Sequence, residues 1–243
     1  MIIKDASCVV TGAARGIGFA MARALLKKGA RVVLSDVDEA ALAEAVSSLD
    51  TVSAIGCVAD VTSASSMAAL ARGAEAHAGQ VQLWVNNAGL ARHRRITEYT
   101  EVEIERMLDV NLKGTILGAQ AALRVMGALG RGHIVNVIST ASLRGIPLET
   151  VYCAAKWGVR GFTQGLREEA APQGVRVTAM LPGGVDTAFW TGAVDRVMPV
   201  EDFLTAEQVA EALVSLVQMD DNVVPQELVL RALRDRDFTH FNA

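Results

Sequence analysis

The sequence has few of the residues that build metal sites and disulfide frameworks. Its 243 residues include three cysteines, Cys8, Cys57 and Cys153, with no C-x-x-C pair among them, and four histidines that lie far apart. Disulfide scaffolds and zinc sites need several such residues at short, regular spacings. We therefore expect reduced thiols and no metal.

Long hydrophobic runs and an excess of basic charge are also absent. A membrane-spanning helix needs roughly 18 consecutive apolar residues, and the chain has no such run. The N-terminal residues lack the basic and apolar segments of a secretion signal. The formal net charge of −4 gives no general attraction to nucleic acid or to anionic membranes. We expect a cytoplasmic protein that binds neither.

What the sequence does contain is the pattern of an α/β fold. Hydrophobic residues make up 51% of the chain and charged residues 21%, which is enough for a sizeable core. Short β-branched runs alternate with longer segments of helical period, and no linker or repeat divides them. This alternation predicts a single domain over residues 1–243, with a doubly wound, Rossmann-type parallel sheet of seven strands and helices on both faces.

The expected elements follow from these periods. A first helix begins near Ile17 and ends at Gly29. Residues 182–204 have no clear period and are too long for an ordinary connection, so they are predicted to form a mobile lid over a site. Strands are expected at residues 7–11, 31–35, 53–58, 81–86, 133–138, 175–180 and 227–231, and further helices at 39–49, 64–78, 102–128, 152–170 and 206–218.

A glycine-rich turn joins the first expected strand to the first helix. Residues 11–18 read Thr-Gly-Ala-Ala-Arg-Gly-Ile-Gly. Glycines there let the chain turn tightly and bring backbone N–H groups against a pyrophosphate. Glycines also serve plain strand-to-helix turns, but this position favours a dinucleotide site. The cofactor contacts expected in the turn are Gly12, Arg15, Gly16, Ile17 and Gly18.

Polar residues follow the next three strands. Asp36 stands where a carboxylate can accept hydrogen bonds from both adenosine ribose hydroxyls and would repel a 2′-phosphate, which favours NAD over NADP. Arg15 argues the other way, because a cation in the turn could meet that phosphate. Asp60 could bond the adenine amino group. Turn chemistry would also explain these residues, but their place at consecutive strand ends favours cofactor contacts, which we extend to Val61, Asn87, Ala88 and Gly89.

Ser139, Tyr152 and Lys156 are the candidate catalytic residues. Ser139 closes the fifth strand, and the i, i+4 spacing of Tyr152 and Lys156 puts the phenol and the ammonium on one helix face. Lowering a phenol pKa from about 10 to near 7 requires about 4 kcal/mol. A cation ~4 Å away at an effective dielectric near 20 supplies about that much. An ordinary helix pair is the alternative, but a nucleotide-type loop upstream favours catalysis.

These motifs, in this order and spacing, resemble the short-chain dehydrogenase/reductase family, in its branch of about 250 residues. The match covers essentially the whole chain. Its motifs are T-G-x-x-x-G-I-G at residues 11–18, Asp60-Val61, N-N-A-G at residues 86–89, Asn111, Ser139, Tyr152 with Lys156, and Pro182-Gly183 followed by Thr187.

The resemblance implies a role for each of four residues. Tyr152 would be the general acid/base, Ser139 would hold the substrate oxygen, and Lys156 would lower the Tyr152 pKa and bind the nicotinamide ribose. Asn111 would anchor a water that continues the proton relay. The implied reaction is reversible hydride transfer between a nicotinamide cofactor and a secondary alcohol or ketone.

The resemblance also bears on the C-terminal third of the chain. It implies cofactor contacts at Pro182, Gly183, Val185 and Thr187. The last expected strand is followed by a charged segment where family members often have glycines, and this difference puts the family's C-terminal tetramer contacts in doubt. The two long helices expected at residues 102–128 and 152–170 still offer a dimer interface, so a homodimer or homotetramer is expected.

The substrate end of the site is less well defined by the sequence. The basic residues 92–95 are interpreted as a solvated loop, with contact to an anionic substrate as the alternative. A catalytically silent dinucleotide-binding regulator and a nucleic-acid-binding protein are the alternative functions. Apolar residues point equally to an alcohol or ketone pocket and to internal packing: Leu143, Ile146, Pro147, Leu148, Phe189 and Trp190.

Overall fold

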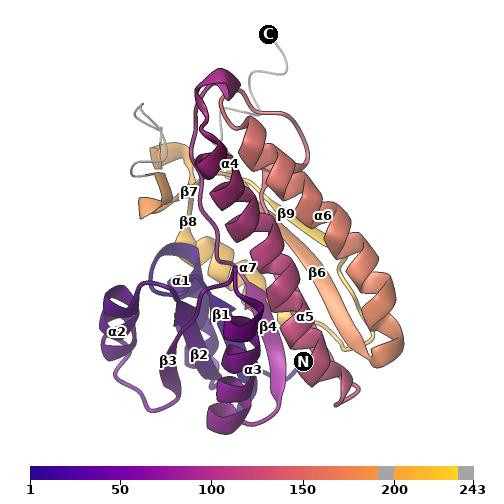
Figure 1. Ribbon diagram of the computed structural model, residues 1–243. Coiled ribbons are helices and arrows are strands. Elements are labelled where there is room, and N and C mark those ends of the chain that lie inside the picture. The colour runs from indigo at the N-terminus through magenta and orange to yellow at the C-terminus, as the bar shows by residue number, and fades with distance from the viewer. Residues whose placement is uncertain (191–199, 235–243) are drawn as a thin grey trace.

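A computed structural model of the chain describes residues 1–190 and 200–234. Its main sheet contains seven parallel strands in the order β3-β2-β1-β4-β5-β6-β9 (Figure 1). This is the doubly wound sheet that the sequence predicted. The strands are β1 (Ser7–Thr11), β2 (Arg31–Asp36), β3 (Ala54–Val58), β4 (Val81–Asn86), β5 (Gly132–Val137), β6 (Val175–Pro182) and β9 (Glu227–Leu230).

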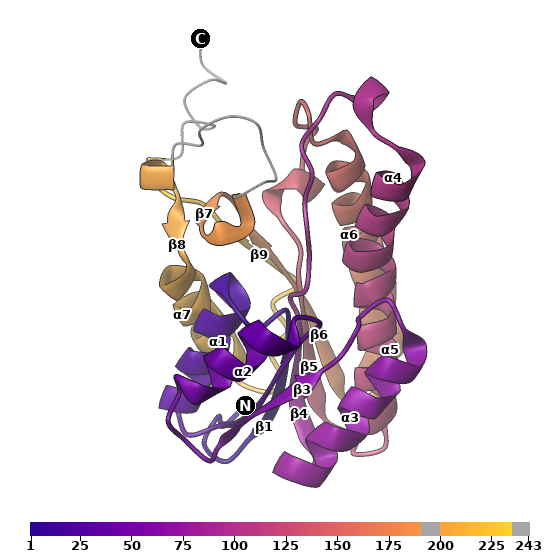
Figure 2. The same ribbon diagram turned by 60° about the vertical axis from the view of Figure 1, so that its left-hand side comes forward.

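Helices cover both faces of this sheet, as Figure 2 shows. One face packs against α1 (Gly16–Lys27), α2 (Glu39–Ser47) and α7 (Ala206–Val217). The other packs against α3 (Ala64–Ala78), α5 (Gly114–Gly127) and α6 (Thr150–Ala170). Because the strands are buried on both faces, they read as continuous apolar runs and not as alternating ones.

The order of the strands places the site. The chain winds from β1 outward to β3 in one direction and from β4 outward to β9 in the other. At such a reversal the loops after the two central strands turn to opposite sides and leave a crevice at their carboxyl ends. The glycine-rich turn follows β1 and Asn87 follows β4, so both lie at this crevice.

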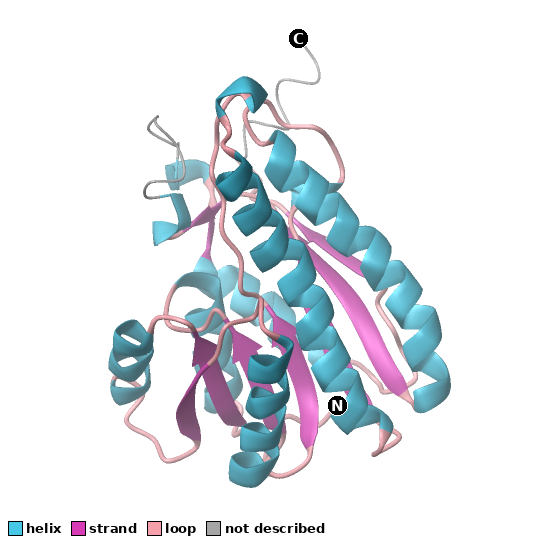
Figure 3. Ribbon diagram, in the orientation of Figure 1, coloured by secondary structure: helices cyan, strands magenta, loops and turns pink. Residues whose placement is uncertain are grey.

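The helix predicted over residues 102–128 is interrupted. The structure has α4 (Glu101–Leu108), a π-helical turn (Asp109–Lys113) and then α5, which follow one another as a single rod in Figure 3. Asn111 Nδ2 donates to the Met107 carbonyl at 2.9 Å, and this carbonyl is the acceptor that the backbone N–H of residue 111 uses in a regular α-helix. Apolar periodicity cannot report such a local change, and π-helical turns of this kind are frequent at functional sites.

The segment predicted to form a lid has short elements at both ends. After β6 comes β7 (Val185–Asp186), which pairs in parallel with β8 (Leu204–Thr205). Residues 191–199 of the predicted lid, and residues 235–243 after β9, lie outside the described part of the chain. Within that part, no helix has the length and apolar character needed to cross a membrane.

Candidate functional site

A cleft of about 1130 Å³ opens at the carboxyl ends of β1 and β4. With the exception of Gly18, every residue that the sequence analysis assigned to catalysis or cofactor binding lines it. These residues are Gly12, Arg15, Gly16, Ile17, Asp36, Asp60, Val61, Asn87, Ala88, Gly89, Asn111, Ser139, Tyr152, Lys156, Pro182, Gly183, Val185 and Thr187.

The glycines of the turn are required by close backbone approach. Gly12 has a φ of 62°, and a Cβ at this position would lie 2.7 Å from the Ala88 Cα. A Cβ at Gly18 would lie 2.3 Å from the Gly12 carbonyl oxygen, closer than any real contact allows. Gly18 thus lies behind the cleft wall, where it lets α1 approach the turn.

Thr11 fastens the two central strands together beneath the turn. Its Oγ1 accepts hydrogen bonds from the backbone N–H groups of Asn87 and Ala88, both at 3.1 Å. Asn87 Nδ2 in turn donates to the carbonyls of Thr11 and Gly12, both at 3.0 Å. Sequence reasoning assigned Thr11 no contact of its own, because its position at the strand end gives no sign that its hydroxyl turns toward β4.

The floor of the turn fits the pyrophosphate of a dinucleotide. Helix α1 begins after Arg15, whose side chain makes no capping hydrogen bond. The first N–H groups of a helix need acceptors and carry partial positive charge. Because Arg15 supplies no capping acceptor, these N–H groups offer a ready position for an anion.

Carboxylates dominate the far end of the cleft, past the turn. Asp36 lies at the end of β2, where its carboxylate oxygens accept from the backbone N–H groups of Ala14 and Asp38, both at 3.2 Å. The Arg15 guanidinium pairs with the Asp38 carboxylate at 3.0 Å. The cation that could have met a 2′-phosphate is therefore paired with an acid.

Asn111 and Gly89 bring the π-helical turn into contact with the loop after β4. Asn111 is fully buried, donates to the Leu90 carbonyl at 2.8 Å and accepts from the Leu90 N–H at 3.3 Å. A Cβ at Gly89 would lie 2.9 Å from Asn111 Oδ1 and 3.7 Å from Lys156 Nζ. Asn111 and Lys156 thus both lie next to Gly89.

Ser139, Tyr152 and Lys156 meet at the bottom of the cleft. The Lys156 ammonium lies 5.5 Å from the centroid of the Tyr152 ring and donates to the Val137 carbonyl at 3.4 Å. Burial lowers the pKa of Lys156 to about 8. Both side chains come from the first two turns of α6, as their spacing predicted.

The pKa of Tyr152 moves in the direction opposite to the one expected from Lys156. Burial of the phenol raises this pKa, and the carboxylate of Glu149 raises it further, while a hydrogen bond with Ser139 acts the other way. Sequence spacing showed the cation but not the depth of burial or the nearby acid.

Aromatic side chains enclose the substrate end of the cleft. Phe189 lies 6.2 Å from Tyr152 and 5.5 Å from Trp190, and Trp190 lies 5.3 Å from Phe203, measured between ring centroids. Trp190 Nε1 donates to the Val185 carbonyl at 2.8 Å. Of the apolar residues expected here, Ile146, Phe189 and Trp190 line the cleft, whereas Leu143, Pro147 and Leu148 do not.

The interpretation of residues 92–95 as a solvated loop is wrong for His93. Its side chain is buried, its ring centroid lies 5.7 Å from Trp190 and 6.3 Å from Tyr152, and its Nδ1 lies 3.6 Å from Glu149 Oε1. The run of basic residues concealed one that turns inward. Sequence reasoning also missed Glu149, which gave no sign other than its place three residues before Tyr152.

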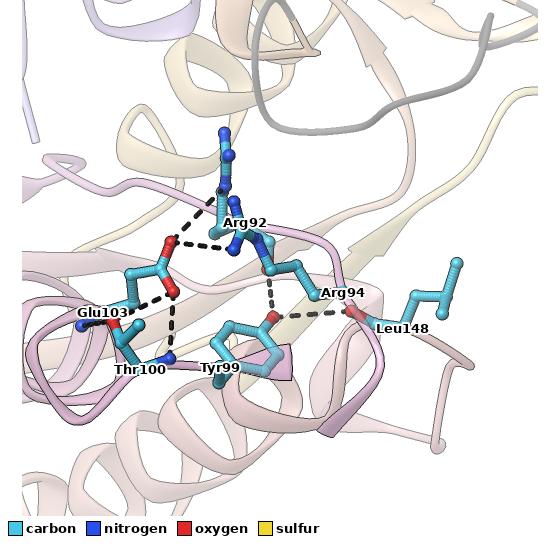
Figure 4. Close-up of polar contacts among 6 residues, drawn as sticks. All are labelled: Arg92, Arg94, Tyr99, Thr100, Glu103 and Leu148. Carbon is cyan, nitrogen blue, oxygen red and sulfur yellow. Dashed lines mark hydrogen bonds and ion pairs between the residues drawn. The ribbon is translucent and has the colours of Figure 1, made fainter. Parts of the chain in front are cut away.

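Contacts between two loops hold this arrangement, as Figure 4 shows. The Arg94 N–H donates to the Leu148 carbonyl at 2.9 Å, and the Tyr99 hydroxyl donates to the carbonyls of Arg92 and Leu148. Glu103 pairs with the guanidinium groups of Arg94 at 3.4 Å and Arg92 at 3.8 Å.

Comparison with known proteins agrees with this geometry. The family model for short chain dehydrogenases matches residues 6–197. An uncharacterized oxidoreductase of Staphylococcus saprophyticus is 36% identical over 232 residues, covering 94% of this chain and 98% of that protein. One of Staphylococcus aureus is 35% identical over 231 residues, covering 95% and 98%.

Solved structures give the same result. An alcohol dehydrogenase from the archaeon Thermococcus sibiricus, complexed with 5-hydroxy-NADP, superimposes with a TM-score of 0.85 at 31% identity, over 94% of this chain and 97% of that one. A 3-ketoacyl-(acyl-carrier-protein) reductase from Brucella melitensis, complexed with NADH, gives 0.87 at 28%, over 96% and 99%. The chain therefore belongs to the short-chain dehydrogenase/reductase family and is an oxidoreductase that uses a nicotinamide cofactor.

Proposed function

We propose that this oxidoreductase interconverts a secondary alcohol and a ketone with NAD as the preferred cofactor, and that Tyr152 is its general acid/base. The observation that carries the proposal is the meeting of Ser139, Tyr152 and Lys156 at the bottom of the cleft that the glycine-rich turn opens. A catalytically silent nucleotide-binding protein would have no need of this set.

The reaction transfers one hydride between the cofactor and a substrate carbon, and one proton between Tyr152 and the oxygen on that carbon. When bound, the nicotinamide would give hydride from its C4 to the substrate carbon that bears the oxygen, or accept hydride from that carbon. Tyr152 takes the alcohol proton during oxidation and returns it during reduction. Ser139 holds the substrate oxygen beside the phenol, and the Lys156 ammonium favours the phenolate form.

Asn111 completes the proton path as a positioning residue. Its side chain amide is tied to both backbone groups of Leu90, so it stays fixed beside Gly89 and Lys156. A water held there would link the Lys156 ammonium to solvent, so that Tyr152 can exchange its proton between turnovers.

The cofactor contacts proposed are the predicted residues that line the cleft. Gly12, Gly16 and the first N–H groups of α1 would hold the pyrophosphate, and Asp60 with Val61 the adenine. Residues 87–89 and 182–187 would hold the nicotinamide half. Asp36 favours NAD, because its carboxylate would accept from both ribose hydroxyls, and the pairing of Arg15 with Asp38 supports the same preference.

The wider organisation is proposed on the same basis. Residues 1–243 would form one catalytic domain in which 182–204 cover the substrate, since Phe189 lies 6.2 Å from Tyr152 between ring centroids. The long helices α4–α5 and α6 lie on one outer face and would join two copies into a homodimer, or into a homotetramer with a further interface.

A fluorescence titration with NADH and NADPH, followed by an alcohol and ketone screen, tests the proposal. Tyr152→Phe should bind NADH as the wild type does and lose about 10²- to 10⁴-fold in kcat, the range that general acid/base catalysis supplies. The matched control is Thr150→Val, which removes an exposed hydroxyl from the same helix at a position that does not line the cleft. Near-normal turnover by Tyr152→Phe would refute the assigned role.

A further inference from the structure

Glu149 is a buried acid at the substrate end of the cleft. It is the N-cap residue of α6 and lines the cleft, with a side chain that is 9% exposed. Its Oε1 lies 3.6 Å from Nδ1 of His93, and the His93 ring centroid lies 6.3 Å from that of Tyr152. The Glu149 carboxylate lies close enough to raise the pKa of the Tyr152 phenol.

His93 and one contact between two loops flank this carboxylate. His93 Nδ1 lies 3.6 Å from Glu149 Oε1, and the Arg94 N–H next to it donates to the Leu148 carbonyl. Leu148 has a φ of 72°, in the left-handed region, where an L-residue costs roughly 1–2 kcal/mol. Strain of this kind gathers where a loop must present a side chain at a defined position.

Apolar side chains share this part of the cleft with Glu149 and His93. Pockets for small ligands are mostly hydrophobic, and a few well-placed polar groups then decide orientation and selectivity. A fixed carboxylate accepts hydrogen bonds and repels a second carboxylate. The apolar or aromatic side chains that share this part of the cleft are Leu90, Met107, Ile146, Phe189 and Trp190.

We propose that Glu149 determines substrate specificity by accepting a hydrogen bond from a hydroxyl group on the carbon next to the reacting carbon. This inference rests on the proposed function and names its substrate class as the vicinal hydroxy ketone and the corresponding diol. The donor is a neutral hydroxyl and not an ammonium, because His93, Arg92 and Arg106 line the same cleft.

The reaction balances with the cofactor as the reductant. The ketone carbon receives hydride from the reduced nicotinamide, its oxygen receives the Tyr152 proton, and the carbonyl double bond becomes a C–O single bond. The products are the vicinal diol, the oxidised cofactor and a Tyr152 phenolate that is reprotonated from solvent. The neighbouring hydroxyl keeps its proton and donates it to Glu149 throughout.

Three ketones of equal chain length test the assignment: 1-hydroxy-2-butanone, 2-butanone and 2-oxobutanoate, each reduced with NADH. The wild type should favour the hydroxy ketone over 2-butanone by about tenfold or more in kcat/KM, because a site built for a hydroxyl rejects the analogue without it. Glu149→Leu, which keeps the size but not the acceptor, should remove this preference and still reduce 2-butanone. The matched control, Glu168→Leu at an exposed position of the same helix, should leave it unchanged.

A second variant keeps the test decisive if Glu149→Leu fails to fold. Glu149→Gln removes the charge alone, so it should raise kcat/KM for 2-oxobutanoate relative to 2-butanone by about tenfold, a change of about 1.4 kcal/mol. Unchanged substrate ratios in both variants, or a wild type that prefers 2-butanone, would overturn the inference alone. A wild type that binds NADH but reduces none of the three ketones would overturn this inference, and failure to turn over any compound of the wider alcohol and ketone screen would refute the proposed function as well.

Discussion

Replacing Lys156 with methionine tests how the cleft makes a buried phenol usable as a base. The two side chains are similar in length, so the change removes the charge and keeps most of the packing. With the ammonium 5.5 Å from the Tyr152 ring and an effective dielectric near 20, their interaction is about 3 kcal/mol. This corresponds to about two units in the pKa of Tyr152, or about 100-fold in the phenolate population.

Burial makes this help necessary. Burial and the Glu149 carboxylate both raise the pKa of Tyr152, and Lys156 acts against them only while it is protonated. Because the pKa of Lys156 is about 8, its ammonium is nearly fully populated at pH 7 and is lost as the pH rises above 8. The advantage of the wild type should therefore be nearly complete at pH 7 and below, and should shrink as the pH rises through 8.

The assay is kcat for alcohol oxidation at saturating alcohol and NAD⁺, measured from pH 6 to pH 10. The kcat of Lys156→Met should be about 100-fold lower than that of the wild type at pH 7, and its rise with pH should occur about two pH units higher. Lys27→Met, at an exposed end of α1, is the control. A loss by the same factor at every pH would refute the electrostatic role and leave Lys156 only a part in holding the cofactor.

Two further predictions concern the cofactor and the fold. Asp36→Ala should lower the NAD over NADP ratio of kcat/KM by about tenfold or more, since a 2′-phosphate would no longer meet a carboxylate; an unchanged ratio would place the selectivity elsewhere. Burial lowers the pKa of His133 to about 3. Between pH 6.5 and pH 3 the unfolded chain therefore binds a proton that the folded chain does not, and the free energy of unfolding decreases as the pH is lowered. Urea unfolding should show a loss of about 2 kcal/mol at pH 5 from this group. His133→Gln should not show it, and an equal loss in both proteins would contradict the assignment.

Much of this protein follows from local patterns in the sequence. Parallel strands buried on both faces leave apolar runs, and their crossover helices leave a 3.6-residue period, so the order of elements was predictable. The turn at Gly12 and the pair Tyr152–Lys156 were predictable as well, because each depends on neighbours within a few residues along the chain.

Contacts between distant segments decided the rest. The Asn111 side chain is held by hydrogen bonds with the backbone of the distant Leu90, and the segment that carries His93 is joined to the Leu148 loop by the Arg94 N–H. Neither contact leaves a periodic trace in the sequence. The pKa of Tyr152 likewise depends on how deeply the phenol is buried and on which acid lies beside it. Solvation and charge act through space, so the chemistry of this cleft was determined only when tertiary packing brought its walls together.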